Sequence, residues 1–221
     1  TSTLPGDYFA LAHTSTSDAT YLLIYNPHPV AVTARVTYVQ PSGKGVKRTY
    51  ALSAKQRIGL HVNADPFVIA NTPHAAVVQT QDAARPLVAE LSNYHGSGWP
   101  AGEATEGVRP SSTWLFAEGA TGLSVNFQES FAIFNPSDEA VNVAMTFYGA
   151  TGAVLLTKTV PISAGPGVTR VAVNPDLPTS EHSTRLVATG RDTGQPRGIV
   201  AERLMRWNSQ IEGHRSAGVP A

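Results

Sequence analysis

The tetrapeptide Ile24-Tyr25-Asn26-Pro27 returns as Ile133-Phe134-Asn135-Pro136, 109 positions further along the 221-residue chain. At the same offset, Val36-Thr37-Tyr38 returns as Met145-Thr146-Phe147. Because separate motifs keep one offset, the repeat is in register. A period near 110 residues is the size of a small domain and exceeds the roughly 20 to 50 residues of solenoid or propeller repeats. The sequence therefore predicts a duplicated module.

The repeat extends through both halves, with offsets that drift only between 108 and 112. The further matched segments are Gly43 and Gly152, Val62–Asp65 and Val173–Asp176, His74 and His182, Val88–Glu90 and Val200–Glu202, and Gly107-Val108 and Gly218-Val219. We predict two domains, residues 1–109 and residues 110–221, joined by a short linker. A half of this length buries about two-thirds of its unfolded surface, so it can form a core without metal or disulfides.

Strand patterns follow the repeat. Apolar and polar residues alternate in Ala31–Tyr38 and in Ala140–Tyr148, which is typical of strands with one buried face. The runs before them, Tyr21–Tyr25 and Phe131–Phe134, are each stopped by Asn-Pro. Proline cannot donate a hydrogen bond to a sheet, so each strand should end there. We interpret Asn-Pro as a hairpin corner.

About seven short strands are predicted in each half, with turn signals at roughly 8 to 12 residues. Beyond those above, they are Tyr8–Ala12, Val46–Leu52, Ile58–Val62, Ala75–Gln81 and Leu87–Leu91, and then Trp114–Ala117, Val154–Ile162, Val168–Val173, Thr184–Ala188 and Gly198–Met205. At most, Ala64–Ala70 and Pro175–Thr179 form a helical turn. The predicted fold class is all-β: two tandem immunoglobulin-like β-sandwich domains related by internal duplication.

Composition narrows the function classes. Lysine plus arginine and aspartate plus glutamate both number 16, so no net charge directs the chain to nucleic acid or to an anionic membrane. The chain contains no cysteine, which excludes disulfides, thiolate catalysis and cysteine-bound zinc. No stretch approaches the roughly 18 apolar residues of a membrane span. We expect no cofactor, no nucleic-acid partner and no direct membrane insertion.

Two glutamates are candidate functional residues. Glu90 and Glu202 both follow Val-Ala in a strand-like run, and a carboxylate buried there could bind a ligand or act as an acid with a raised pKa. The structural interpretation pairs Glu202 with an arginine such as Arg185. An enzyme would need a second carboxylate, for which Glu118 is the candidate, at roughly 5 to 9.5 Å.

The histidines and tryptophans have competing interpretations. No two of the seven histidines stand at ligand spacing, so we predict no metal site and a structural role for His74 and His182. Trp99, Trp114 and Trp207 could form a platform that stacks on sugars. The alternative is packing, with Trp114 and Trp207 against each other at one end of the second module. No G-x-S-x-G elbow or phosphate-binding loop is present.

Several segments of the second half carry a resemblance. They are Trp114–Thr121 (WLFAEGAT), Phe134-Asn135-Pro136, Val200–Trp207 (VAERLMRW) and Gly213–Gly218 (GHRSAG). Together they resemble a tandem β-sandwich repeat of exported bacterial surface proteins, which implies export and no established catalytic role. The first half is similar, but Leu11 stands where Glu118 does, and no Gly-His pair matches the one at His214.

We therefore expect a non-enzymatic, extracellular structural or adhesion module of a bacterial surface or secreted protein. It would set spacing or contact a protein or a cell-surface polymer through loops and exposed strand edges, with weak contacts reinforced by avidity. The alternative is a carbohydrate-binding module of a secreted protein. The candidate ligand-binding residues are Trp99, Trp114, Trp207, Glu118, Glu202 and His214.

Overall fold

A computed structural model describes residues 6–15, 17–40, 42–43, 45–68, 72–96, 98, 101–165, 167–208 and 212–221, with residues 11–14 described by their backbone alone. The fold is all-β, and every strand pair is antiparallel. Within these residues the only helical element is a 3₁₀ turn, η1 (Val62–Ala64), and no helix could span a membrane. The predicted fold class is thus confirmed at the level of an all-β sandwich.

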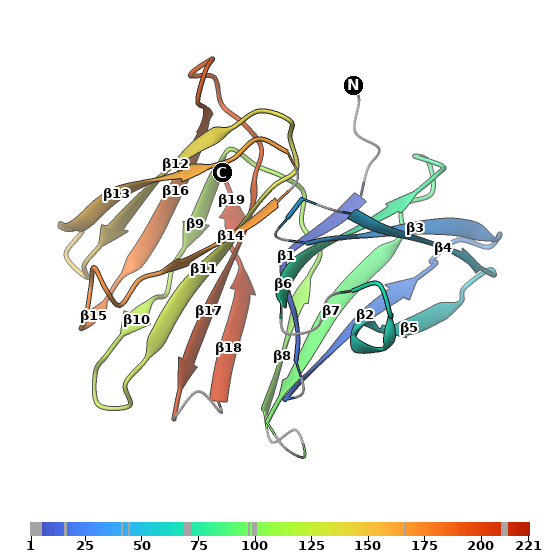
Figure 1. Cartoon of the computed structure of the whole chain (residues 1–221), viewed down its shortest axis with the longest axis horizontal. Helices are drawn as coiled ribbons and strands as arrows, with labels where there is room; N and C mark the ends of the chain where they lie inside the picture. The colour runs from blue at the N-terminus through green and yellow to red at the C-terminus, as the bar shows by residue number, and fades with distance from the viewer. Residues whose placement is uncertain are drawn as a thin grey trace.

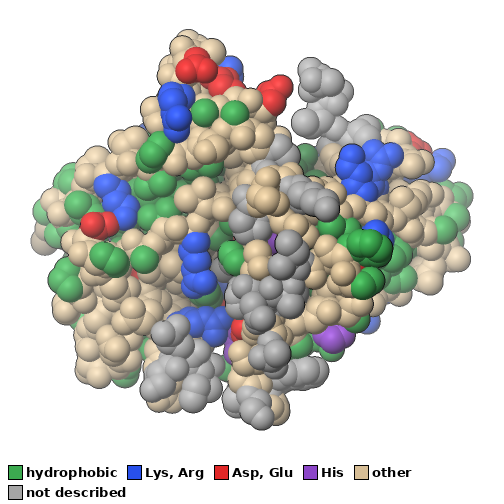
Figure 2. Space-filling model, viewed as in Figure 1, with side chains coloured by type: hydrophobic (Ala, Val, Ile, Leu, Met, Phe, Trp, Pro, Cys, Tyr) green, Lys and Arg blue, Asp and Glu red, His purple; other side chains and the backbone are tan. Residues whose placement is uncertain are grey.

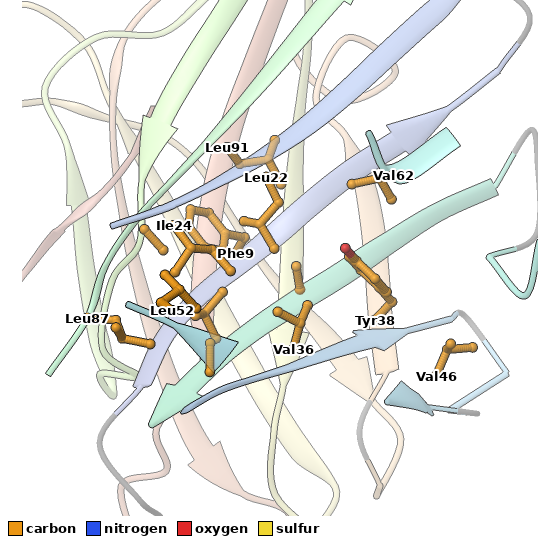
Figure 3. Close-up of a cluster of buried hydrophobic side chains, with 14 of the residues drawn as sticks. Phe9, Leu22, Ile24, Val36, Tyr38, Val46, Leu52, Val62, Leu87 and Leu91 are labelled. Carbon is orange, nitrogen blue, oxygen red and sulfur yellow. The ribbon is translucent and has the colours of Figure 1, made fainter. Parts of the chain in front are cut away.

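The first half contributes two four-stranded sheets (Figure 1). In hydrogen-bonded order they are β1 (Gly6–Thr14), β6 (Thr72–Thr80), β3 (Val32–Val39) and β4 (Gly45–Leu52), and β5 (Arg57–His61), β2 (Asp18–Tyr25), β7 (Val88–His95) and β8 (Ala101–Glu106). Apolar side chains from both sheets point into the space between them, as the labelled residues of Figure 3 show.

The second half contributes a five-stranded and a four-stranded sheet. These are β13 (Val154–Ile162), β12 (Val141–Tyr148), β16 (Ser183–Gly190), β9 (Thr113–Phe116) and β19 (Val219–Pro220), and β14 (Gly167–Ala172), β11 (Gln128–Asn135), β17 (Val200–Trp207) and β18 (Glu212–Ala217). A short pair, β10 (Ala120–Thr121) and β15 (Ser180–Glu181), lies beside them. The core between the two sheets includes Trp114, which is fully buried.

Both halves have the same strand order. The order β1-β6-β3-β4 corresponds to β9-β16-β12-β13, and β5-β2-β7-β8 corresponds to β14-β11-β17-β18. Two copies of one domain would have this arrangement, whereas the duplication and the immunoglobulin-like assignment stay predictions. The predicted boundary at residues 109 and 110 lies in the segment between β8 and β9.

The Asn-Pro segments are not hairpin corners. They carry the chain from β2 to β3 and from β11 to β12, and in each case the two strands belong to different sheets. Asn26 Nδ2 donates to the carbonyl oxygens of Val30 and Ser53, each at 2.8 Å. Asn135 Nδ2 donates in the same way to Glu139 and Ser163, at 2.8 and 3.2 Å. A buried amide therefore ties two inter-sheet connections together in each half.

Two sequence expectations are corrected by the strand assignments. The helical turn expected at Ala64–Ala70 is instead η1, which ends at Ala64, and residues 174–176 form a turn without a helix. The apolar pattern also does not predict β8, because the buried side chains of that strand are those of Glu103 and Thr105. Glu103 can be buried on β8 because Arg206 and Arg215 of the other half lie against it.

The two halves pack against each other through their sheet faces. An apolar cluster joins β1, β3 and β6 to β11 and β17, and it contains Tyr8, Ala10, Val39, Ala75, Val77, Ala132, Phe134, Val200 and Leu204. The rings of Tyr8 and Phe134 lie 6.4 Å apart between centroids. We call this contact the junction. Figure 1 shows β1 and β6 beside β11 and β17 at the centre of the molecule.

Candidate functional site

A cleft of about 470 Å³ lies at the end of the second sandwich near β10 and β15. Clefts of this size are typical of small-molecule sites. Four segments form its walls: residues 117–120 after β9, Leu123 and Phe127 in the loop before β11, residues 148–150 at the end of β12, and residues 181–183. Its lining combines small and aromatic residues with the two carboxylates of Glu118 and Glu181.

A tight loop supplies one wall of the cleft. The backbones of Gly122 and Phe127 exchange two hydrogen bonds, of 2.8 and 2.7 Å, which close the loop between β10 and β11. Gly122 has a φ of +60°, and a Cβ there would stand 2.4 Å from the carbonyl oxygen of Pro178. Only glycine fits this left-handed position at such close approach. The loop therefore presents Leu123 and Phe127 to the cleft in a fixed conformation.

A buried histidine and glutamate lie behind the cleft. His182 Nε2 is 3.1 Å from Glu129 Oε2, and both side chains are completely buried. The His182 ring stands edge-on to Phe147 at 5.2 Å, just as His74 stands edge-on to Tyr38 at 5.8 Å in the first half. The histidine is therefore part of the scaffold that both halves share, as predicted from its recurrence.

Glu129 is the addition that belongs to the second half, since the matched residue of the first half is Thr20. Ser180 Oγ is hydrogen-bonded to His182 Nδ1 at 3.3 Å, and serine, histidine and glutamate therefore stand in series, with His182 and Glu129 in contact at ion-pair distance and without hydrogen-bond geometry. Such a series activates a nucleophile only where the nucleophile meets the substrate. Ser180 is not among the residues that line the cleft.

Glu118 and His214 come together around a buried arginine. Arg203 Nη2 donates to Glu118 Oε2 at 2.9 Å and lies 3.1 Å from His214 Nδ1. The Arg203 side chain is 2% exposed, whereas that of Glu118 is 64% exposed at the wall of the cleft. Burying a charge is costly unless it is paired, so Arg203 fixes the position of the Glu118 carboxylate. These two predicted site residues thus belong to one cluster.

Glu202 lies on the opposite face of β17 and has a different role. Its Oε1 accepts a hydrogen bond of 2.7 Å from the backbone N–H of Ala10, and its Oε2 is 3.7 Å from Arg215 Nε. Successive residues of a strand point to opposite faces, so Glu202 faces the junction while Arg203 faces Glu118. Glu118 and Glu202 therefore do not form the facing pair of carboxylates that the enzyme interpretation requires.

The expected pairing of Glu202 with Arg185 is wrong. Arg185 belongs to β16, in the five-stranded sheet, and its side chain is exposed. Glu90, the residue of the first half that matches Glu202, is exposed as well. The burial of Glu202 thus follows from contact between the halves, which no pattern within one half contains.

A cluster of charged side chains extends the junction at the edge near β8 and β18. The side chain of His95 is 2% exposed; its Nδ1 lies 2.5 Å from Asp18 Oδ1 and its Nε2 lies 2.8 Å from Glu103 Oε1. Arg206 and Arg215 from the second half approach Glu103 Oε1 at 3.6 and 3.8 Å. Figure 2 shows basic, acidic and histidine side chains gathered along the line between the halves.

Burial and ion pairing act in opposite directions in this cluster. Burial lowers the pKa of His95, but its hydrogen bonds with Asp18 and Glu103 outweigh that effect and raise the pKa above its usual value. Burial likewise raises the pKa of Glu103, but His95, Arg215 and Arg206 outweigh it and lower the pKa. Both groups are therefore stabilised in their charged forms.

The tryptophans do not form a common platform. Trp114 is fully buried, and its Nε1 donates to the carbonyl oxygens of Ser111 and Ile199 at 3.0 and 2.9 Å. Trp207 is half-buried and packs against Phe127 with ring centroids 5.4 Å apart. Ile199 precedes the start of β17 and Trp207 ends it, so the expected packing of Trp114 against Trp207 does not occur. Trp99 lies outside the described residues.

Sequence reasoning missed Arg203, Glu129 and the His95 cluster. The signal for the first two was present, because the matched positions of the first half hold Leu91 and Thr20. A charge at a position where the matched residue of the other half is apolar or small indicates a local specialisation. Among the described residues, no three histidine, aspartate or glutamate side chains are placed to hold a metal ion.

Comparison with known proteins gives no family. Neither the protein-family models nor the curated proteins match the chain. Among solved structures, a Thermotoga maritima protein (1070) is 16% identical with a TM-score of 0.42, over 49% of this chain and 96% of its own. The Anabaena sensory rhodopsin transducer is 17% identical with a TM-score of 0.33, over 38% of this chain and 89% of its own.

A Bacteroides uniformis beta-glucuronidase is 13% identical with a TM-score of 0.24, over 90% of this chain and 24% of its own. None of these likenesses is close enough to indicate a function.

Proposed function

We propose that the chain is a non-enzymatic extracellular module of a bacterial surface or secreted protein, in which two β-sandwiches form one rigid spacer. The observation that supports this proposal is the junction. Domains within a chain are expected to move relative to each other unless their contact is large and apolar. Here nine buried apolar residues meet between the halves, and a buried glutamate binds the backbone of Ala10 across the contact.

Exposed edges give such a module places to contact a partner. Strand β13 is an edge of its sheet, and Val154 and Leu155 at its start are exposed by 59% and 44%. An unpaired strand edge can accept a strand from another chain. A protein or a cell-surface polymer is the partner class that we propose, and adhesion would follow from repeated weak contacts.

Rigidity can be measured directly because the chain has no cysteine of its own. Ala54→Cys and Ala153→Cys place one spin label on an exposed turn of each half. We expect a single narrow distribution of label-to-label distances in pulsed electron paramagnetic resonance. A broad distribution, as a flexible linker would give, would contradict the spacer function.

The contact function needs a separate measurement. We expect fluorescently labelled protein to bind intact bacterial cells or purified cell-surface polymers, and Leu155→Lys on the edge of β13 to reduce that binding. Glu90→Gln, an exposed change in the other half, is the control. If the two variants bind alike, β13 is not the contact.

The carbohydrate-binding alternative has less support. Trp114 is fully buried in the core, so it cannot be part of a sugar-stacking platform. The other described tryptophan, Trp207, packs its ring against Phe127. A glycan array with the purified chain tests this alternative. Loss of glycan binding on Trp207→Ala would favour it over the spacer.

A further inference from the structure

We propose that the cleft of the second sandwich binds a primary ammonium group carried on an alkyl stem or on a sugar ring. This site is independent of the spacer function, since it lies within one half. Among the described residues that line the cleft, the carboxylates are Glu118 and Glu181, the one imidazole is that of the buried His182, which contacts Glu129, and neither lysine nor arginine is present.

The two carboxylates are not equivalent. Glu118 is matched by Arg203, whose guanidinium donates to it at 2.9 Å. Within the described residues no cation pairs with Glu181, which is exposed. The cleft therefore has one unmatched negative charge, and a ligand with one positive charge complements it.

The walls of the cleft select the rest of the ligand. Leu123 is 40% exposed, and it lines the cleft together with Phe127, Tyr148 and the small residues Ala117 and Ala150. Such a lining contacts methylene groups or a sugar ring, and an aromatic face also attracts a cation. The oriented Glu118 carboxylate remains able to accept a hydrogen bond on its exposed side. A primary ammonium has three donors, enough for both carboxylates.

The first half provides an internal comparison. Where the second half has Glu118 and Glu181, the matched positions of the first half hold Leu11 and Pro73. Neither of these side chains can bind a cation, although His74 and His182 keep the same structural role in both halves. The carboxylates of the cleft are therefore not required by the sandwich scaffold.

The test uses the full chain and two pairs of probes. Nα-acetyl-lysine methylamide is compared with its neutral form acetylated on the side-chain amine, and glucosamine is compared with N-acetylglucosamine. Binding is followed by calorimetry and by the NMR shifts of Gly119 and Gly149. We expect one or both amines to bind and their neutral counterparts to bind at least about tenfold more weakly. Which amine binds better identifies the source, a lysine side chain or an amino sugar.

Three variants show whether the cleft is responsible. We expect Glu181→Gln to weaken amine binding about tenfold, and Ala150→Leu, which fills the cleft, to abolish it. Glu90→Gln removes the same charge from an exposed strand of the first half and should leave binding unchanged. Both cleft positions are exposed, so the melting temperature should stay constant in all three variants.

Other outcomes overturn the proposal. Equal binding of amines and neutral probes would show that charge is not recognised. Absence of binding at millimolar concentration would show that the cleft is not an ammonium site. Equal effects of Glu181→Gln and Glu90→Gln would place binding elsewhere on the surface.

Discussion

Gly119 shows how a single residue can depend on a buried polar pair. Its backbone passes over the His182 and Glu129 side chains, and its N-terminal neighbour is the cleft residue Glu118. A Cβ at Gly119 would stand 2.5 Å from His182 Nε2 and 3.1 Å from Glu129 Oε1. Because both of these groups are buried and packed, neither can move without loss of contacts.

We expect Gly119→Ala to lower the free energy of unfolding by about 1 to 3 kcal/mol, as overpacking does. Gly59→Ala is the matched control, since the nearest atom to its Cβ would be a leucine methyl at 3.4 Å, an ordinary contact. Denaturation by urea measures both. Equal stability of the two variants would mean that the backbone at Gly119 can shift away from His182 at little cost in free energy.

At the scale of a single side chain, the sequence predicted which residues distinguish the second half from the first. It predicted less well what those residues contact. Glu118 and His214 were singled out because they lack counterparts in the first half, and they do share one cluster. Their common partner, Arg203, is not predicted from its own strand, because it follows Glu202 and two adjacent charges are typical of an exposed position; only the match to Leu91 of the first half indicates that it is buried. Glu202 was assigned the wrong arginine, because its true surroundings include residues of the other half.

The Asn-Pro motif lies in the connections between the two sheets of each half. Asn26 and Asn135 hold corresponding connections with the same side-chain amide, and each Oδ1 also accepts an N–H bond of 3.0 Å from the residue two positions later. The sequence motif indicated where the strands end. It could not tell a hairpin from a crossing between sheets, because both begin with a chain reversal after the strand.

We expect Asn26→Ala and Asn135→Ala each to lower the free energy of unfolding by about 1 to 3 kcal/mol, because the carbonyl groups of two connections lose the buried side-chain amide that donates to them. The two losses should be similar, since the two amides make matching contacts. Asn142→Ala, at a half-buried strand position, serves as the control. A large loss in one half alone would show that the connections are not equivalent.

At the scale of the whole molecule, the sequence predicted two sandwiches but not their docking. Each half repeats its own pattern of apolar residues, whereas the junction is built from the outer faces, where Tyr8, Phe134 and Leu204 read as ordinary strand residues. Only the strand order in space reveals that these faces meet. Strand β8 was not predicted for the same reason: its buried Glu103 is paired with arginines of the other half, which no pattern within the first half contains.

We expect Phe134→Ala to cost about 3 to 5 kcal/mol, as removal of a buried phenylalanine does, and to separate the unfolding of the two halves. Differential scanning calorimetry should show one transition in the native chain and two in the variant. Val88→Ala, at a half-exposed position, should keep a single transition. Two transitions in the native chain would show that the halves unfold independently.

The His95 cluster makes the junction depend on pH. The pKa of His95 is raised, so its contribution is fully present below 6.5 and is lost as pH rises through the raised value. The pKa of Glu103 is lowered, so its contribution is present above 4.5 and is lost as pH falls through the lowered value. The melting temperature should therefore fall as pH rises above 6.5, and less steeply in His95→Asn. Parallel curves for the two proteins would contradict this role.

The junction also limits how such a chain can evolve. In arrays of independent domains, copies are gained or lost one at a time, because each copy is soluble alone. Here each half has an apolar outer face that the other half covers. Deletion of either half would leave that face open to aggregation. The two halves are therefore expected to be kept or lost together.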